Sequence, residues 1–293
     1  MRRVSPIQTR SCRLRDKSVT NRSVPVDTSW TIAPAVLLSV AVYLGLYAVR
    51  WRRVRATHGA RGAGGGRLGL WLAGLALVIV ALMSPLDRIG EQLASGHMVQ
   101  HLLLADLVPI ALILALTKVL LRPVTRQVHA LEKRAGWLAH PAVGVVAYVG
   151  TMWFWHIPPL YDAALDNALV HVTEHLTFAA SGFLYWWHLI SPIRSRLRLG
   201  GMAPIAYMAS TKLLVGALGV FLAFYPKLLY DPYAIAGERW GMSPVTDQHV
   251  AGLIMGLEQS LVMGVGLAYL FARMLRESED ADRRAERLEE RAA

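Results

Sequence analysis

Seven long apolar stretches constrain the fold of this chain more than any other feature of its sequence. Of its 293 residues 54% are hydrophobic and only 17% are charged, which is the composition of a membrane protein. A helix needs about 20 residues to cross a bilayer, and the stretches lack the two-residue alternation of barrel strands. We predict an all-α polytopic membrane protein, a seven-transmembrane-helix bundle with spans at residues 30–49, 68–86, 96–121, 138–155, 167–190, 202–224 and 249–275.

The connections between these stretches differ in charge. Fourteen Lys and Arg residues lie in the first, third and fifth connections, whereas the other three hold only Arg88, Lys227 and Arg239. The positive-inside rule therefore makes the three basic connections cytoplasmic, with the C-terminus inside and the N-terminus outside the cytoplasmic membrane. Because the net charge of +11 follows this pattern, it indicates orientation in a lipid bilayer and not a nucleic-acid partner.

The chain divides into three regions. Residues 1–29 are basic and lack the apolar core of a secretory signal, so we expect a disordered tail. The positive charge of this tail conflicts with the predicted position of the N-terminus outside the membrane. One interpretation is a misassigned start, with translation beginning near Val24 or Val26, and the alternative is a tolerated tail. Residues 30–275 form the transmembrane domain, and residues 276–293 form a charged cytoplasmic tail.

Six of the ten histidines fall at the predicted outer face. They include two His-x-x-x-His pairs, which open the third and fifth stretches, and this spacing places both rings of a pair on one helix face. Histidine is rare facing lipid and common as a metal ligand, so we predict a metal site here. Its candidate ligands are His97, His101, His156, His171, His175 and His249, with the thioether of Met98 as a further candidate.

The alternative for each of these imidazoles is a structural role, capping a helix end or bonding a loop carbonyl. The chain's single cysteine, Cys12, lies in the basic tail, which excludes thiolate clusters. The remaining histidines lie on or near the predicted cytoplasmic side without a partner four residues away, and we interpret them as structural: His58, His129, His140 and His188.

Three charged residues lie near the predicted middle of the membrane: Asp106, Lys212 and Glu258. A charge there costs several kcal/mol unless it is paired. We expect Lys212 to pair with one of the carboxylates, and the alternative is a proton or ion relay. Asp106 lies nine residues beyond His97, which is half a turn out of phase on a helix, so we do not expect it in the histidine site.

Five motifs in order resemble the CtaG family of cytochrome c oxidase assembly factors, the multi-spanning membrane type. They are Met-Ser-Pro-Leu-Asp at 83–87, His-Met-Val-Gln-His-Leu-Leu-Leu at 97–104, Trp-His-Ile-Pro-Pro-Leu-Tyr-Asp-Ala-Ala-Leu at 155–165, His-Val-Thr-Glu-His-Leu-Thr-Phe at 171–178, and Trp-Gly-Met-Ser-Pro-Val-Thr-Asp-Gln-His-Val-Ala-Gly-Leu-Ile-Met at 240–255.

The resemblance covers about residues 30–275. It implies a chaperone that binds copper and delivers it during assembly of the respiratory oxidase. A membrane-bound cytochrome c oxidase subunit is the implied partner, and a soluble copper donor is a second candidate. The implied functional residues are His97, His101, His156, His171, His175 and Asp247.

Two other functions stay open at this stage. One is a b-type haem protein in which histidines of the third and fifth stretches ligate iron. The other is a copper or proton transporter that uses Asp106, Lys212 and Glu258. We expect no enzyme, because the sequence carries no nucleophile–base arrangement and no nucleotide-binding loop.

Overall fold

The protein is a bundle of long helices, seen in a computed structural model that describes residues 25–193, 197, 199–235 and 240–292. Within these residues the regular structure is helical, without strands. The helices are α1 (Pro34–Gly62), α2 (Gly65–Met83), α3 (Pro85–Gly90), α4 (Ala94–Leu102), the π-helix η1 (Leu103–Leu107), α5 (Val108–Ala115), α6 (Lys118–Leu121), α7 (Thr125–Ala135), η2 (Gly136–Ala139), α8 (Pro141–Trp155), α9 (Pro158–Asp166), α10 (Ala168–Ile190), α11 (Ala203–Phe224), η3 (Asp231–Ile235) and α13 (Pro244–Ala292).

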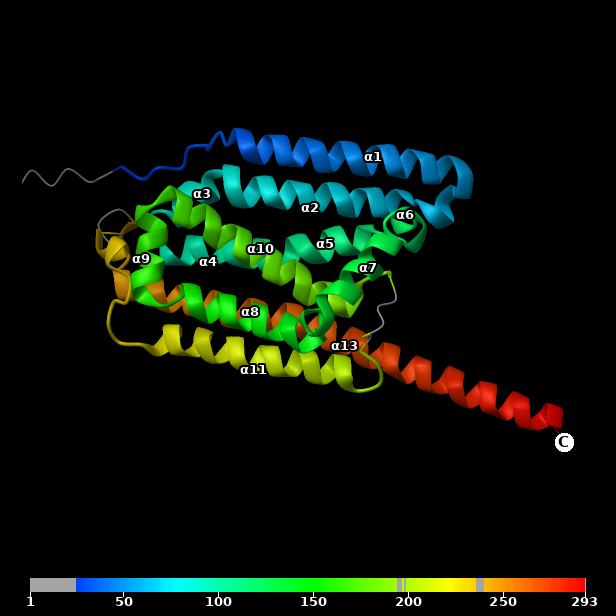
Figure 1. Ribbon diagram of the computed structural model, residues 1–293. Helices are drawn as coiled ribbons and strands as arrows, with labels where there is room; N and C mark the ends of the chain where they lie inside the picture. The colour runs from blue at the N-terminus through cyan, green and yellow to red at the C-terminus, as the bar shows by residue number, and fades with distance from the viewer. Residues whose placement is uncertain (1–24, 194–196, 198, 236–239, 293) are drawn as a thin grey trace, which may run out of the picture.

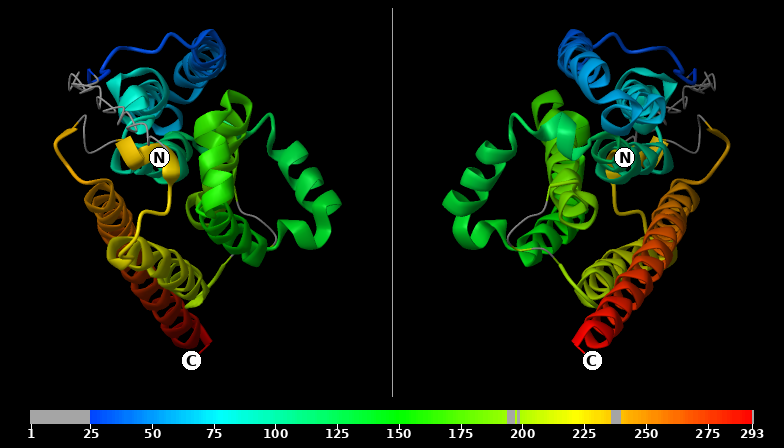
Figure 2. Two further views of the ribbon diagram at one scale, coloured as in Figure 1. Left: turned by 90° about the vertical axis from the view of Figure 1, so that its left-hand side faces the viewer. Right: turned by 90° about the vertical axis from the view of Figure 1, so that its right-hand side faces the viewer.

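The long helices run side by side along one direction (Figure 1). Helices α1 and α2 lie on one side of the bundle and α11 and α13 on the opposite side (Figure 2). The continuous segment α4–η1–α5 lies between them and packs against α2, α10 and α13. Helix α13 continues far past the other helices (Figure 1), so the predicted tail after residue 276 is helical where the structure describes it.

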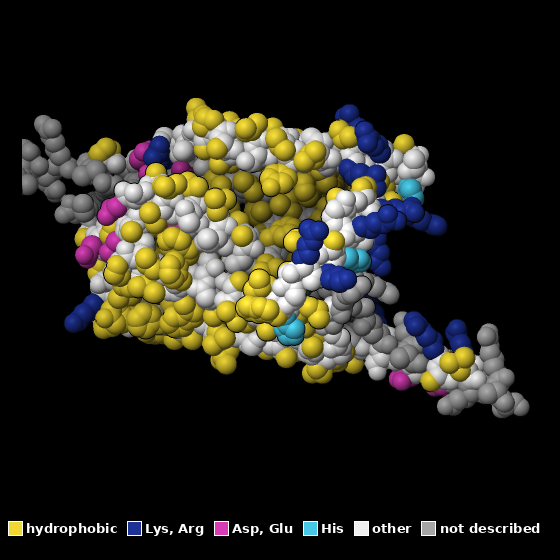
Figure 3. All heavy atoms as spheres, viewed as in Figure 1, with side chains coloured by type: hydrophobic (Ala, Val, Ile, Leu, Met, Phe, Trp, Pro, Cys, Tyr) yellow, Lys and Arg dark blue, Asp and Glu magenta, His cyan; other side chains and the backbone are white. Residues whose placement is uncertain are grey.

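The outer surface of the bundle is apolar, as a lipid environment requires. Leu46, Leu213 and Leu257 are each at least 67% exposed, and hydrophobic side chains cover the middle of the molecule in Figure 3. Buried polar groups lie inside instead, including His97, His101 and Asp106. An apolar surface that covers the middle of a molecule faces lipid or a protein partner.

Five helical segments are long and apolar enough to cross a membrane: Pro34–Gly62, Gly65–Met83, Ala94–Ala115, Ala203–Phe224 and Pro244–Arg276. The prediction of seven spans is therefore supported for five. The two other predicted spans differ for separate reasons. Helix α8 has only 15 residues, and α10 carries Glu174 and three histidines, which reduce its hydropathy.

Several helix boundaries differ from the predicted ones, because polar caps and prolines set where the helices begin and end. The third span ends at Ala115, where Leu116 is extended and the Thr117 hydroxyl caps α6. The second ends at Met83, because the Ser84 hydroxyl accepts a hydrogen bond from the Leu86 N–H and starts α3. The seventh helix starts at Pro244, ahead of the predicted residue 249.

The two ends of the bundle carry opposite charge. Lys and Arg side chains gather around α6 and α7, whereas Asp and Glu side chains gather at the opposite end, near α3 and α9 (Figure 3). The Arg50 guanidinium donates to the carbonyls of Val119 and Leu120, which ties the first and third predicted connections together. This arrangement agrees with the predicted loop charges. Residues 1–24 and the predicted basic residues Arg194, Arg196, Arg198 and Arg239 lie outside the described residues.

A proline and a glycine shape the centre of the bundle. Pro109 has no N–H to donate to the Ala105 carbonyl four residues earlier, so the α-helical ladder cannot continue there and η1 adopts π geometry. Gly182 of α10 packs directly on this turn, and a β-carbon on it would lie 2.0 Å from the Ala105 carbonyl oxygen. Only glycine permits this approach.

We predict that Gly182→Ala lowers the free energy of unfolding by about 1–3 kcal/mol, the usual cost of overpacking a core. The measurement is thermal unfolding of the purified protein in detergent, followed by tryptophan fluorescence. Gly150→Ala in α8 is the matched control, because a β-carbon there meets no atom within 4 Å and alanine favours a helix. Equal losses in both variants would contradict the close-packing argument.

Candidate metal centre

The two histidine pairs lie at the same end of the bundle because α4 and α10 both begin there (Figure 1). His97 and His101 lie on α4, and their Nε2 atoms are 2.7 Å apart. His171 and His175 lie on the first two turns of α10, with ring centroids 4.2 Å apart. The two helices place the pairs face to face.

The rings of the two pairs come together in the interior. Ring centroids are 5.3 Å apart for His97 and His171 and 5.6 Å apart for His101 and His175. His156, which follows α8, joins them with its ring 6.3 Å from that of His101. His97 and His101 are fully buried, whereas His171 is only half-buried and lies nearest to solvent. Five of the six predicted histidines thus form one cluster.

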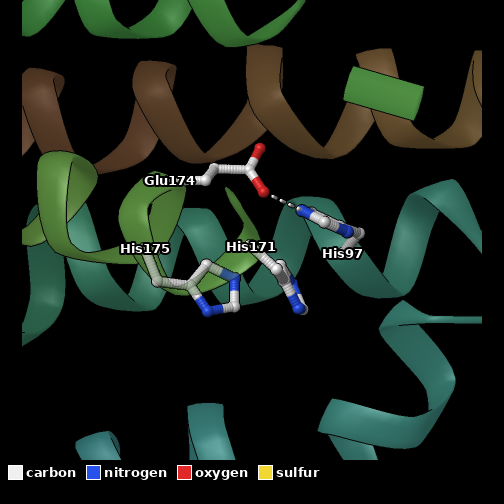
Figure 4. A group of neighbouring side chains, drawn as sticks. All are labelled: His97, His171, Glu174 and His175. Carbon is white, nitrogen blue, oxygen red and sulfur yellow. Dashed lines mark ion pairs between the residues drawn. The ribbon is translucent and has the colours of Figure 1, made fainter. Parts of the chain in front are cut away.

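Glu174 is the sixth member of this cluster, and the sequence analysis missed it. Its carboxylate is completely buried, with Oε2 3.4 Å from Nε2 of His97 and Oε1 3.3 Å from Nε2 of His101. Figure 4 shows it facing His97 beside His171 and His175. Ligand atoms of these four residues all lie within 4.8 Å of one another. The sequence did carry a signal for Glu174, because it lies three residues after His171 and therefore on the same helix face.

Hydrogen bonds on the far side of two rings fix which nitrogen is free. The Nδ1 atom of His156 lies 2.6 Å from the Met152 carbonyl, so Nδ1 carries the proton and Nε2 has a lone pair. Tyr233 donates its hydroxyl proton to the Gly90 carbonyl at 2.7 Å, so at 3.3 Å it accepts from Nδ1 of His97. Burial raises the pKa of Tyr233 well above its ordinary value, which keeps this proton in place.

Hydrogen bonds of this kind, to the ring nitrogen that faces away from the cluster, orient imidazoles in metal sites. Several of the remaining ring nitrogens have no partner in the described part of the chain. Nε2 of His156, His171 and His175, together with both oxygens of Glu174, is buried without a hydrogen-bond partner among the described residues. Buried polar atoms are rarely left unpartnered in a folded protein. Bound metal would provide partners for these atoms, so the donor set fits a cation held by imidazole and carboxylate.

Asp247 holds the first turn of α4 in place. Its Oδ2 accepts from the Ala94 N–H at 2.6 Å, and its Oδ1 accepts from the N–H and the hydroxyl of Ser95 at 3.1 and 2.5 Å. This carboxylate therefore caps α4 from a different helix, two residues before His97. Its role in the site is to position a ligand helix.

Residues 45–277 match the family model described as cytochrome c oxidase caa3 assembly factor, Caa3_CtaG. This chain belongs to that family. The recognition made from the five sequence motifs is therefore confirmed.

Three mycobacterial relatives are similar to this member of the family, and all three are described as uncharacterized. One from Mycobacterium leprae is 24% identical over 84% of this chain and 38% of its own length. Relatives from Mycobacterium bovis and Mycobacterium tuberculosis are each 26% identical over 64% of this chain and 31% of their own length. The chain thus spans between about a third and two fifths of these relatives. No solved structure matches it.

Two residues predicted as ligands in this family member lie in other surroundings. Nε2 of His249 is 2.9 Å from the Tyr225 carbonyl, so that nitrogen donates to the backbone. Met98 is 1% exposed and belongs to the apolar core of the bundle. Among the described residues, no hydrogen bond joins the side chain of His249 or of Met98 to the five clustered histidines.

The buried charges near the middle of the bundle form a separate polar network. Asp106 accepts hydrogen bonds from the Tyr148 hydroxyl at 2.6 Å and from the Trp186 indole at 2.7 Å. Gln259 donates to Tyr148 at 3.1 Å. Because its partners are neutral donors, Asp106 is held without an ion pair and outside the histidine cluster.

The predicted ion pair of Lys212 does not form as a direct contact among the described residues. Its Nζ donates to the main-chain carbonyl of Gln259 at 3.4 Å, and Glu258 instead accepts from the Gln259 side chain at 3.2 Å. In the described part of the chain, Lys212 has no carboxylate within the 4.0 Å of an ion pair. The glutamine, which the sequence analysis did not single out, occupies the place between these groups.

We predict that Asp247→Ala lowers the free energy of unfolding by about 1–3 kcal/mol, since it removes a helix cap and leaves buried N–H groups unpaired. Hydrogen exchange followed by mass spectrometry should show faster exchange in the first turn of α4. Asp166→Ala is the control, because this exposed side chain ends α9, where a carboxylate contributes little. Unchanged exchange in α4 would contradict the capping role.

Proposed function

We propose that this protein is a cytochrome c oxidase assembly factor that binds copper in the histidine cluster and passes it to the oxidase. One observation carries the proposal. Five imidazoles and one carboxylate converge in the interior of the bundle, with buried ring nitrogens that have no partner among the described residues. Membership of the family indicates a role in oxidase assembly, and the donor atoms of the cluster indicate metal binding.

Copper fits this set of donors. Imidazole nitrogen is a good ligand for copper in both common oxidation states, and carboxylate oxygen is a ligand for Cu(II). No thiolate contributes to the described cluster, since the single cysteine lies at position 12. A site without thiolate holds copper less tightly, which suits a protein that must release its cargo. The half-buried ring of His171 gives the cluster its contact with solvent.

The membrane arrangement follows from the charge of the two ends. We infer that all seven long segments cross the bilayer, with α8 near the short limit and α10 crossing in spite of its polar first turns. The basic end then lies in the cytoplasm with the C-terminus, and the histidine end lies outside. There the site can receive copper from a soluble donor and face a membrane subunit of the oxidase.

The geometry favours a copper-binding chaperone over a haem protein and over a copper or proton transporter. A haem would need a flat macrocycle between α4 and α10, but His101 stacks on Phe178 at 4.0 Å and Glu174 occupies the space between the pairs. Copper or proton transport would need Asp106 to exchange its partners, whereas both of its oxygens are held by neutral donors. We infer binding and delivery, and not catalysis.

We predict that the double substitution His97→Ala with His101→Ala lowers the copper content of the purified protein at least about tenfold. Oxidase activity in membranes of a strain carrying this variant should fall, while the amount of inserted protein stays the same. The measurements are metal analysis, oxygen consumption with reduced cytochrome c, and immunoblotting of the membrane fraction.

Two control variants separate metal binding from general damage. His58→Ala removes an exposed histidine at the opposite end, and His249→Gln removes a histidine outside the cluster. Both should keep normal copper content. The proposal is wrong if the unsubstituted protein, purified after growth with copper, contains none, and a Soret absorption band would support the haem alternative.

A further inference from the structure

The cluster offers more ligands than one copper ion uses. Four or five donors complete the coordination of a copper or zinc ion, and the cluster holds five imidazoles and a carboxylate with two oxygens. Resting on the proposed function, we propose that the cluster binds two metal ions, with the carboxylate of Glu174 bridging them.

The donors can be assigned to two ions. His97, His171 and His175 lie with Glu174 in the compact group whose ligand atoms are within 4.8 Å of one another. His101 lies beside this group, with its Nε2 2.7 Å from that of His97, and its ring centroid is 6.3 Å from that of His156. The first group provides three imidazoles for one ion, and a second group of His101 and His156 provides two imidazoles for another.

Glu174 lies where a bridging ligand must lie. Its Oε2 faces His97 of the first group at 3.4 Å, and its Oε1 faces His101 of the second at 3.3 Å. Neither oxygen accepts a hydrogen bond among the described residues. A bridging carboxylate gives one oxygen to each of two ions, as in two-metal sites with ions about 3.5–4 Å apart.

His156 supports a second ion most directly. If it only supported the ligands of a single ion, both of its ring nitrogens would be hydrogen-bonded. Instead its Nδ1 bonds the Met152 carbonyl at 2.6 Å, while its Nε2 is buried and has no partner in the described part of the chain. This is the arrangement of a metal-binding imidazole, although His156 does not belong to the compact four-residue group.

Charge also favours bound cations. A carboxylate in a dry interior needs positive charge nearby, and the two Nε2 atoms of His97 and His101, 2.7 Å apart, cannot both present lone pairs without a proton or a cation at hand. Bound metal ions meet both requirements.

The test uses the full-length protein in detergent, loaded with Cu(II) or with Zn(II) and freed of excess metal by desalting. Metal analysis should give about two ions per chain for either metal. Electron paramagnetic resonance of the Cu(II) form should account for well under half of the copper, since spins coupled through a carboxylate lose their ordinary signal. His156→Gln should bind about one Cu(II) with a full signal, and Glu174→Gln should lose the coupled state.

Controls make the outcomes distinct. His249→Gln should keep two ions and the reduced signal, and unchanged melting temperatures of all variants show that the fold persists. One Cu(II) per chain in the unsubstituted protein, unchanged in His156→Gln, would overturn the two-ion proposal and leave the proposed function intact. Absence of any bound copper would overturn both.

Discussion

The buried carboxylate of Glu174 is the constraint on which the histidine end of this protein depends. A carboxylate without solvent must be compensated by positive charge or by several hydrogen-bond donors. The structure surrounds it with imidazoles of α4 and α10, and it accepts no hydrogen bond among the described residues. Imidazole is neutral unless protonated, so the compensation must come from a proton or a cation that these rings hold.

The rest of the histidine end of the bundle holds this cluster in position. Asp247 of α13 caps α4, Asn167 caps α10, and Tyr233 of η3 bonds the far side of His97. These residues come from three separate segments, yet each acts on the first turns of a ligand helix or on a ligand ring. Ligands placed on helices with locked rings reach a fixed geometry more precisely than ligands on loops. The motif that contains Asp247 is therefore explained by support of the site and not by coordination.

Much of this organisation could be predicted from the sequence, because it follows from local patterns. The apolar stretches predicted the helical bundle. The four-residue spacing within His97/His101 and His171/His175 predicted that each pair shares a helix face, and the loop charges predicted that both pairs lie at one end. Non-local facts could not be predicted in this way. The cap from Asp247 joins residues 153 positions apart, and Gln259, not a carboxylate, receives Lys212 through its backbone. Glu174 was within reach, since it lies inside a histidine pair, but an isolated acidic residue near a helix start has many ordinary roles.

His171 differs from the other four histidines of the cluster in being half-buried, so the cluster has one edge that is more accessible than its interior. If copper occupies the cluster as proposed, an incoming donor group would meet the His171 edge first. The speed of hand-over would then depend on how readily this outermost imidazole swings away.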